Sequence, residues 1–184
     1  MKLSASKFIS LKEENKLFST IAKSKEKSAI VDLMLFQLLS LTGLRISEAL
    51  NLKWANIGED YLTIVEQKNG TKNGTVIIGN KLLQLLAQFK ELNPYSYSSY
   101  LFNSRRGQYS RTNAHENLKE WLRISGLRSD ISCHNFRHTY ATRCLDSGLP
   151  LTIVRDQLRH SSISVTSVYL HFSKESKDKL KENF

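Results

Sequence analysis

The sequence predicts a mainly helical domain with one small antiparallel β-sheet of three short strands. Long runs of apolar residues at helical spacing indicate several helices. Residues 61–66 alternate in polarity and are followed by two Asn-Gly dipeptides and a second β-branched run, which is typical of a β-hairpin. The length of 184 residues suits one domain with a substantial core.

The first helix is predicted to begin after Ser10. Serine is a favoured N-cap, and Glu13 three residues later completes a capping box. Leu17 and Ile21 give this helix one apolar face. The basic residues 23–27 then form a solvated connection.

The next segment predicts a helix in the centre of the domain. Residues 29–41 are apolar on most sides, as expected for a helix surrounded by other elements. Gly43 ends this helix. Residues 46–54 continue as another helix, with Leu50 and Leu52 directed inward.

The strands are predicted in the middle of the chain. Residues 61–66 and 75–78 are predicted to form the hairpin, and residues 67–74, with their two Asn-Gly dipeptides, are predicted to form the turn between them. The short apolar run at residues 100–102 is predicted to be the third strand.

Four further helices follow the hairpin. Their predicted ranges are 80–92, 111–124, 133–146 and 151–159. The pair Ser161 and Ser162 then favours the start of a new helix, because serine is a good N-cap. Tyr169 lies about two turns into that helix and can be turned back toward His160.

The net charge of +10 favours an anionic partner, nucleic acid first, although charge alone also fits a merely soluble basic protein. The 40% apolar and 24% charged residues are typical of a soluble globular protein. Cys133 and Cys144 lack zinc-site spacing and fit free thiols in a reducing cytosol. The N-terminus has no apolar run of signal-peptide length, and the nearly apolar residues 30–41 are too short to span a bilayer. We therefore expect no membrane partner and a cytoplasmic, nucleoid-associated protein.

Residues 133–169 contain the strongest functional signal. His134 and Arg137 are three positions apart and share a face if this segment is helical; His160 and Tyr169 follow. Arginine binds phosphate oxygens, and histidine supplies hydrogen bonds or a proton. No carboxylate cluster for a metal accompanies them, so the set fits a phosphodiester attacked by a tyrosine.

A second arginine lies upstream, in residues 42–48. Arg45 is placed at a predicted helix start, where free backbone N–H groups favour an anion. The alternative is a surface arginine that pairs with Glu48 one turn further on.

These four pieces, in this order, resemble the tyrosine recombinase (phage integrase) family. The matching pieces are the segment around Arg45, the His-x-x-Arg at His134 and Arg137, the Leu-x-His at His160, and the tyrosine nine residues later. The resemblance covers nearly the whole chain. It implies the catalytic-domain fold of tyrosine recombinases and a site-specific recombinase or integrase that cleaves and rejoins double-stranded DNA.

The resemblance also implies residue roles. Tyr169 attacks the scissile phosphate and forms a 3′-phosphotyrosyl link. Arg45 and Arg137 bind the non-bridging oxygens, His134 assists proton removal from the tyrosine, and His160 hydrogen-bonds the phosphate. The bond energy is kept in the covalent link, so no metal or nucleotide cofactor is expected.

A lysine in the predicted hairpin is implied as the general acid. The sequence before the turn favours Lys68. Counting back from the returning strand instead places Asn69 at the expected position and leaves Lys72 as a rival. Glu48 matches the family's acidic residue and is expected to orient groups rather than react.

Several basic residues are candidate DNA contacts. Arg105, Arg106 and Arg111 lie in or next to the predicted loop of residues 104–111, which either meets phosphates or is a solvated charge run. Lys72 is a further candidate.

One residue departs from the family pattern. Arg159 stands where the family usually has glycine before the histidine. Its bulky side chain is expected either to shift His160 slightly or to add a phosphate contact.

Residues 1–172 are assigned to the catalytic domain, and no N-terminal core-binding domain is expected. The charged tail of residues 173–184 is either frayed or docks on a neighbouring protomer, and the family resemblance implies a homotetramer on DNA. The alternatives are a type IB topoisomerase, which acts as a monomer with a similar residue set, and a DNA-binding module that has lost cleavage.

Overall fold

The structure, a computed structural model, describes residues 5–65, 73–95, 97–105, 107–160 and 162–171. The α-helices are α1 (Leu11–Ala22), α2 (Ala29–Thr42), α3 (Ile46–Leu50), α4 (Asn80–Leu92), α5 (Arg111–Ile124), α6 (Cys133–Asp146), α7 (Leu151–Leu158) and α8 (Ile163–Ser167). The 3₁₀ helices are η1 (Ala5–Lys7), η2 (Trp54–Asn56) and η3 (Val168–His171). The strands are β1 (Tyr61–Val65), β2 (Asn73–Ile77), β3 (Asn103–Ser104) and β4 (Gly107–Gln108).

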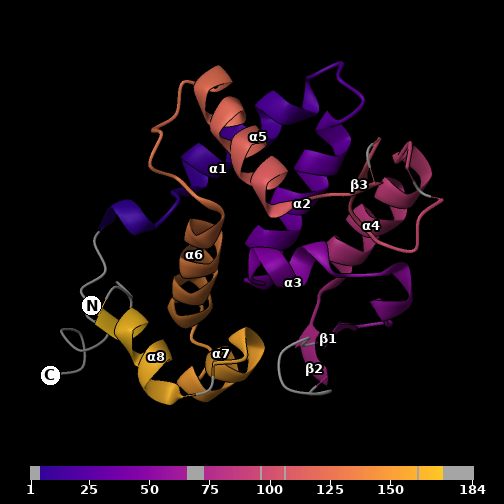
Figure 1. The fold of residues 1–184 in the computed structure, drawn as a ribbon. Helices are drawn as coiled ribbons and strands as arrows, with labels where there is room; N and C mark the ends of the chain where they lie inside the picture. Colours follow the sequence, from indigo (N-terminus) through magenta and orange to yellow (C-terminus); the bar gives the residue numbers. More distant parts are fainter. Residues whose placement is uncertain (1–4, 66–72, 96, 106, 161, 172–184) are drawn as a thin grey trace, which may run out of the picture.

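Helix α2 is the centre of the domain. It packs against α1, α4, α5 and α6, and most of its side chains are buried, which confirms the prediction for residues 29–41. Helix α6 lies between this group and the α7–α8 pair, and the β1–β2 hairpin lies beside α7 (Figure 1). The mainly helical fold class is therefore confirmed.

The strands differ in part from the prediction. Strands β1 and β2 pair antiparallel, with Ile64 opposite Gly74. The predicted third strand at residues 100–102 is wrong: β3 follows it and pairs with β4, so the described strands form two separate sheets. Leu101 and Phe102 are fully buried in the core. The backbone N–H of Leu101 donates to the carbonyl of Leu52, and not to a carbonyl of the β1–β2 hairpin.

Helix α3 is shorter than the predicted helix of residues 46–54. After Leu50 the chain turns toward residues 99–101, where the N–H of Trp54 donates to the carbonyl of Ser99. These inter-segment hydrogen bonds replace the helical ones. Leu50 and Leu52 are nevertheless buried, as predicted.

Gly43 ends α2 in the left-handed conformation, with φ of 65°. A Cβ at this position would lie 2.6 Å from Cδ1 of Tyr140 and 2.8 Å from Cδ2 of Leu158. Glycine is therefore required both by its backbone angle and by the close approach of α6 and α7. Arg45 follows this turn and lines one cavity together with His134 and Arg137 of α6.

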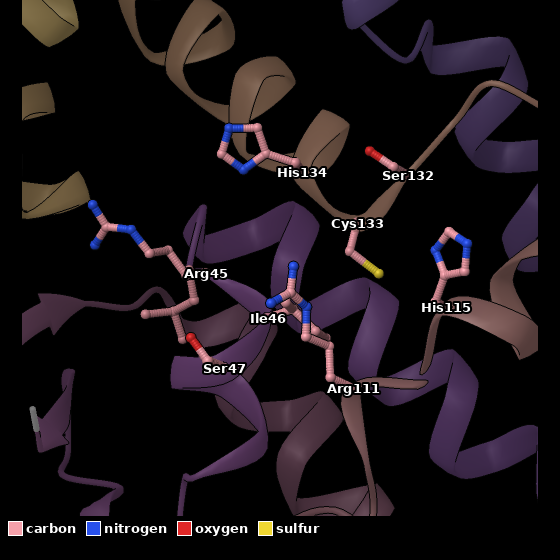
Figure 2. A pocket seen from close by; sticks show the side chains of 9 residues that line it. Arg45, Ile46, Ser47, Arg111, His115, Ser132, Cys133 and His134 are labelled. Atoms are coloured by element: carbon pink, nitrogen blue, oxygen red, sulfur yellow. The ribbon is translucent and has the colours of Figure 1, made fainter. Parts of the chain in front are cut away.

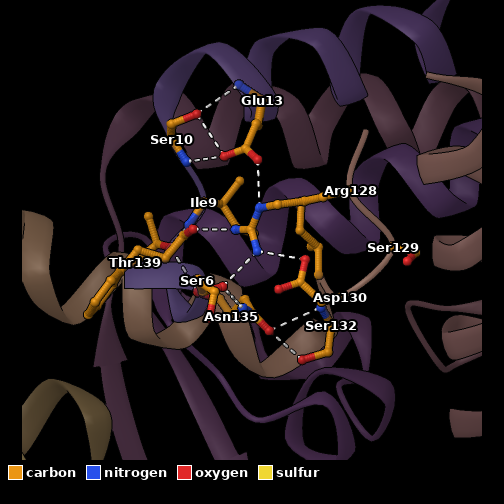
Figure 3. Close-up of polar contacts among 12 residues, drawn as sticks. Ser6, Ile9, Ser10, Glu13, Arg128, Ser129, Asp130, Ser132, Asn135 and Thr139 are labelled. Carbon is orange, nitrogen blue, oxygen red and sulfur yellow. Dashed lines mark hydrogen bonds and ion pairs between the residues drawn. The ribbon is translucent and has the colours of Figure 1, made fainter. Parts of the chain in front are cut away.

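The N-terminal segment is held against α6 by a polar network (Figure 3). Arg128 donates to Oε1 of Glu13 and to the carbonyl of Ser6, both at 2.7 Å. Asn135 on α6 donates to the same carbonyl at 3.2 Å. The predicted capping box between Ser10 and Glu13 is present as well.

The buried apolar residues form two clusters. The larger one includes side chains of α1 to α5, the β1–β2 hairpin and Phe136 of α6. The smaller one joins α6, α7 and η3 and contains Leu145, Val154, Leu158 and Tyr169. Of the helices in the described ranges, none has the length and apolarity needed to cross a membrane.

Candidate active site

A cavity of about 610 Å³ lies beside the N-terminal half of α6. Its lining includes five residues that the sequence singles out: Arg45, His134, Arg137, His160 and Tyr169. They come from the start of α3, from α6, from the end of α7 and from η3. The fold thus brings together side chains that are far apart in the sequence.

Arg137 is the most firmly held member of this set. Its side chain is almost completely buried, with 2% exposure. Nη1 donates to the carbonyl of Gly43 at 2.7 Å, and Nη2 donates to the carbonyl of Leu158 at 2.5 Å. Burial and the nearby Arg45 lower the pKa of Arg137 to about 10, so it stays charged at neutral pH. Three further N–H donors remain for an anion in the cavity.

Arg45 occupies the more open side of the cavity, and 43% of its side chain is exposed. Its Nη1 lies 2.8 Å from Oε1 of Glu48, and its backbone N–H donates to Oε2 at 2.8 Å. Glu48 also receives Nη2 of Arg159 at 2.5 Å. One carboxylate oxygen of Glu48 therefore contacts two guanidinium groups.

Tyr169 lies in the cavity wall with 4% exposure. Its hydroxyl is 2.8 Å from Nδ1 of His138, a residue that the sequence reasoning missed. The available signal was spacing: His138 is four positions after His134 on one helix, and therefore on the same face. Burial raises the pKa of Tyr169, and the positive charge of Arg137 opposes that rise.

The histidines of the cavity are kept neutral. Burial is the larger cause and nearby cationic groups are the smaller one; together they lower the pKa of His138 and of His160 to about 4. The same causes lower the pKa of His134. The rings of His134 and His138 meet edge to face, with 4.4 Å between their centroids. Nδ1 of His160 lies 2.8 Å from Oγ1 of Thr166, which fixes the ring and leaves its other nitrogen for a ligand.

Comparison with known proteins identifies the family of this chain. Residues 7–176 match the profile of the Phage integrase family. The chain belongs to the phage integrase family. It is 33% identical over 149 residues to tyrosine recombinase XerD of Chlorobaculum tepidum, covering 78% of this chain and 49% of that protein. It is 28% identical over 181 residues to tyrosine recombinase XerC of Pediococcus pentosaceus, covering 94% and 59%.

Solved structures of a recombinase and an integrase share the fold. XerA recombinase superposes with a TM-score of 0.78 at 22% identity, over 96% of this chain and 62% of that one. The catalytic domain of bacteriophage HP1 integrase gives a TM-score of 0.69 at 22% identity, over 95% and 93%. The predicted catalytic-domain fold of tyrosine recombinases is therefore confirmed. The chain spans about half the length of the curated relatives that it matches.

A second cavity of about 460 Å³ adjoins the first, sharing Arg45 and His134 with it. The second cavity lies between the starts of α3, α5 and α6. Figure 2 shows Arg45, Arg111 and His134 around it. Arg111 is exposed and was predicted as a DNA contact. Lys7, which sequence reasoning did not single out, lines the first cavity. The two cavities together offer a cationic surface.

The remaining predicted residues are placed as follows. Arg105 is exposed. Lys68, Lys72 and Arg106 lie outside the described residues. Arg159 is turned inward, with 10% of its side chain exposed, rather than toward solvent. Across the described ranges, no group of three or more His, Cys, Asp or Glu side chains is arranged to hold a metal ion.

Proposed function

We propose that this chain cleaves and rejoins double-stranded DNA as a site-specific recombinase, through a 3′-phosphotyrosyl intermediate on Tyr169. The observation that carries the proposal is the single cavity in which two arginines, the histidines and one tyrosine converge. Family membership supports the same reaction.

The arginines form the phosphate-binding half. Arg137 is fixed by two backbone carbonyls, and Arg45 is fixed by Glu48. Both guanidinium groups bind the non-bridging oxygens and stabilise the charge that develops in the transition state. Because both are held before DNA arrives, little reorganisation is needed when the reaction occurs. His160 donates a further hydrogen bond to the phosphate.

Tyr169 forms the reacting half. Its oxygen attacks phosphorus, the bond to the 5′-oxygen breaks, and the phenolic proton leaves with assistance from His134. His138 orients the hydroxyl through the existing 2.8 Å contact. The negative charge of a bound phosphate raises the pKa of a nearby histidine, so DNA binding makes these imidazoles better proton acceptors.

The leaving 5′-oxygen needs a proton. We assign this role to Lys68, with Lys72 as the alternative, because both lie between β1 and β2 in the sequence. A 5′-hydroxyl from a partner strand then reverses the step.

DNA binding and assembly complete the proposal. The net charge of +10 and the cationic lining of both cavities suit a phosphate backbone. Arg105, Arg106 and Arg111, together with Lys72, are proposed backbone contacts. A similar fold occurs in XerH site-specific recombinase bound to difH substrate and in a lambda integrase dimer bound to a core site. We propose that four copies act together on two DNA sites, as exchange of both strands of two duplexes requires.

The test is a nicked suicide substrate, or supercoiled plasmid if the native site is unknown. The wild-type protein should give a covalent protein–DNA band on a denaturing gel, and Tyr169→Phe should not. Tyr97→Phe is the matched control, because Tyr97 is 81% exposed and lines neither cavity. A band that persists in Tyr169→Phe would disprove the assignment of the nucleophile.

The same reactions separate the alternatives. Relaxation of plasmid by a monomer, without exchange between two sites, would identify a type IB topoisomerase. DNA binding without any covalent band would identify a non-cleaving module. Exchange between two matched sites, accompanied by a tetramer, is the result that the proposal predicts.

A further inference from the structure

Arg159 has an unusual backbone for its residue type. Among the described residues it is the one non-glycine residue with positive φ, at 54°. It forms the C-cap of α7 in the left-handed conformation, a position that glycine normally fills at lower conformational cost. A side chain that persists at such a position must make contacts that offset the cost.

The first of these contacts is with Glu48. Nη2 of Arg159 lies 2.5 Å from Oε1 of Glu48, and the two side chains are only 10% and 11% exposed. The same carboxylate oxygen also accepts Nη1 of Arg45. Arg159 therefore reaches the phosphate-binding arginine through one shared carboxylate.

The second contact is with the hairpin. A Cβ at Gly74 of β2 would overlap Cδ of Arg159 and lie 2.9 Å from its Nε. Gly74 has no positive φ, so its backbone angle does not explain the glycine. The missing side chain makes room for Arg159 to cross the strand.

Neighbouring groups fix the same junction. Gln157 donates to the carbonyl of Ile77 at 2.7 Å and accepts its N–H at 3.0 Å, as a strand partner would. One residue further, the carbonyl of Leu158 accepts Nη2 of Arg137. The end of α7 thus contacts β2 on one side, and on the other it contacts Arg137 directly and Arg45 through Glu48.

We propose that Arg159 is a positioning residue for DNA cleavage, which acts through Glu48 on Arg45 and requires glycine at position 74. This positioning role is proposed in place of a direct contact between Arg159 and DNA. The cleavage part of this inference rests on the proposed function, whereas its packing part does not.

The packing is tested by a double-mutant cycle on thermal stability. Gly74→Ala should lower the Tm by roughly 3–6 °C, because the methyl group overlaps a confined side chain. In the Arg159→Gly background the same change should have no destabilising effect. Gly79→Ala is the matched control, since a Cβ there meets no atom within 4 Å, and its effect should be equal in both backgrounds. Equal Gly74→Ala effects in the two backgrounds would overturn the pairing.

The positioning role is tested by single-turnover cleavage and by DNA affinity at several salt concentrations. Arg159→Gly should slow cleavage about tenfold or more, because small misplacements of a catalytic group are costly. Its DNA affinity and salt dependence should stay unchanged. In the Glu48→Gln background, Arg159→Gly should add little further loss. Arg159→Lys should recover part of the rate, because it restores a positive charge near Glu48.

Two outcomes would overturn the role. If Arg159→Gly made the negative slope of log affinity against log salt shallower by about 0.9, Arg159 would be shown to neutralise a phosphate itself. If the losses in cleavage rate of Arg159→Gly and Glu48→Gln simply multiplied in the double variant, Arg159 would be shown not to act through Glu48. If the wild-type protein does not cleave DNA, the proposed function fails and the positioning role fails with it, while the stability cycle still decides the packing.

Discussion

The two halves of the active site are built in different ways. Arg137 is buried and is held by backbone carbonyls at the ends of α2 and α7. Tyr169 belongs to the small cluster between α6, α7 and η3, and its hydroxyl contacts a side chain, His138. Substitution of Arg137 should therefore disturb folding and catalysis together, whereas substitutions in the nucleophile half should affect catalysis more than folding.

The largest effects are expected at the arginines. Arg137→Ala should lower the cleavage rate by about 10² to 10³ and destabilise the fold by about 2 kcal/mol or more, because two buried carbonyls lose their donor. Arg45→Ala should give a similar rate loss with little change in stability, since 43% of the Arg45 side chain is exposed. Single-turnover cleavage and urea unfolding measure both quantities. Equal stability losses in the two variants would contradict the contrast drawn between these arginines.

An intermediate effect is expected at His138. His138→Ala should slow cleavage about tenfold, the equivalent of one hydrogen bond of about 1.4 kcal/mol, and leave DNA affinity unchanged. His138→Gln should recover part of the rate, because an amide can still bond the hydroxyl of Tyr169. A loss of affinity as large as the loss of rate would instead place His138 in DNA binding.

The smallest effect is expected from pH. The folded pKa of His138 and of His160 is about 4, below the unfolded value of about 6.5. Between these values the unfolded chain binds more protons, so stability is full above about pH 6.5 and is lost as the pH falls toward 4. Arg137, Lys7 and His134 face His138 and reinforce this direction. The unfolding free energy measured across this range should decline less steeply in His138→Phe, and an identical slope would contradict the assignment.

Most helices could be predicted because their signals are local. The capping box at Ser10 and the apolar residues of α2 specify structure through neighbours in the sequence. The site residues could be predicted from the order of their motifs along the chain. The structure of residues 100–102 could not be predicted, because this segment pairs with distant backbone near Leu52.

Two features of the site could not be predicted from sequence. The partners of Arg137 are backbone carbonyls, which every residue type carries, so the sequence does not indicate which residues supply them. Arg159 could be noted as a departure from the family's glycine, but its direction depends on the packing of α7 against the hairpin. A side chain's direction at such a junction is decided by tertiary contacts rather than by local pattern.

The most direct measurement of the central claim is to map the covalent bond. The protein–DNA adduct would be digested with nuclease and protease, and the nucleotide-bearing peptide sequenced by mass spectrometry. The account predicts a nucleotide on Tyr169, attached through a 3′-phosphate. A nucleotide on any other residue, or a 5′-phosphate linkage, would contradict it.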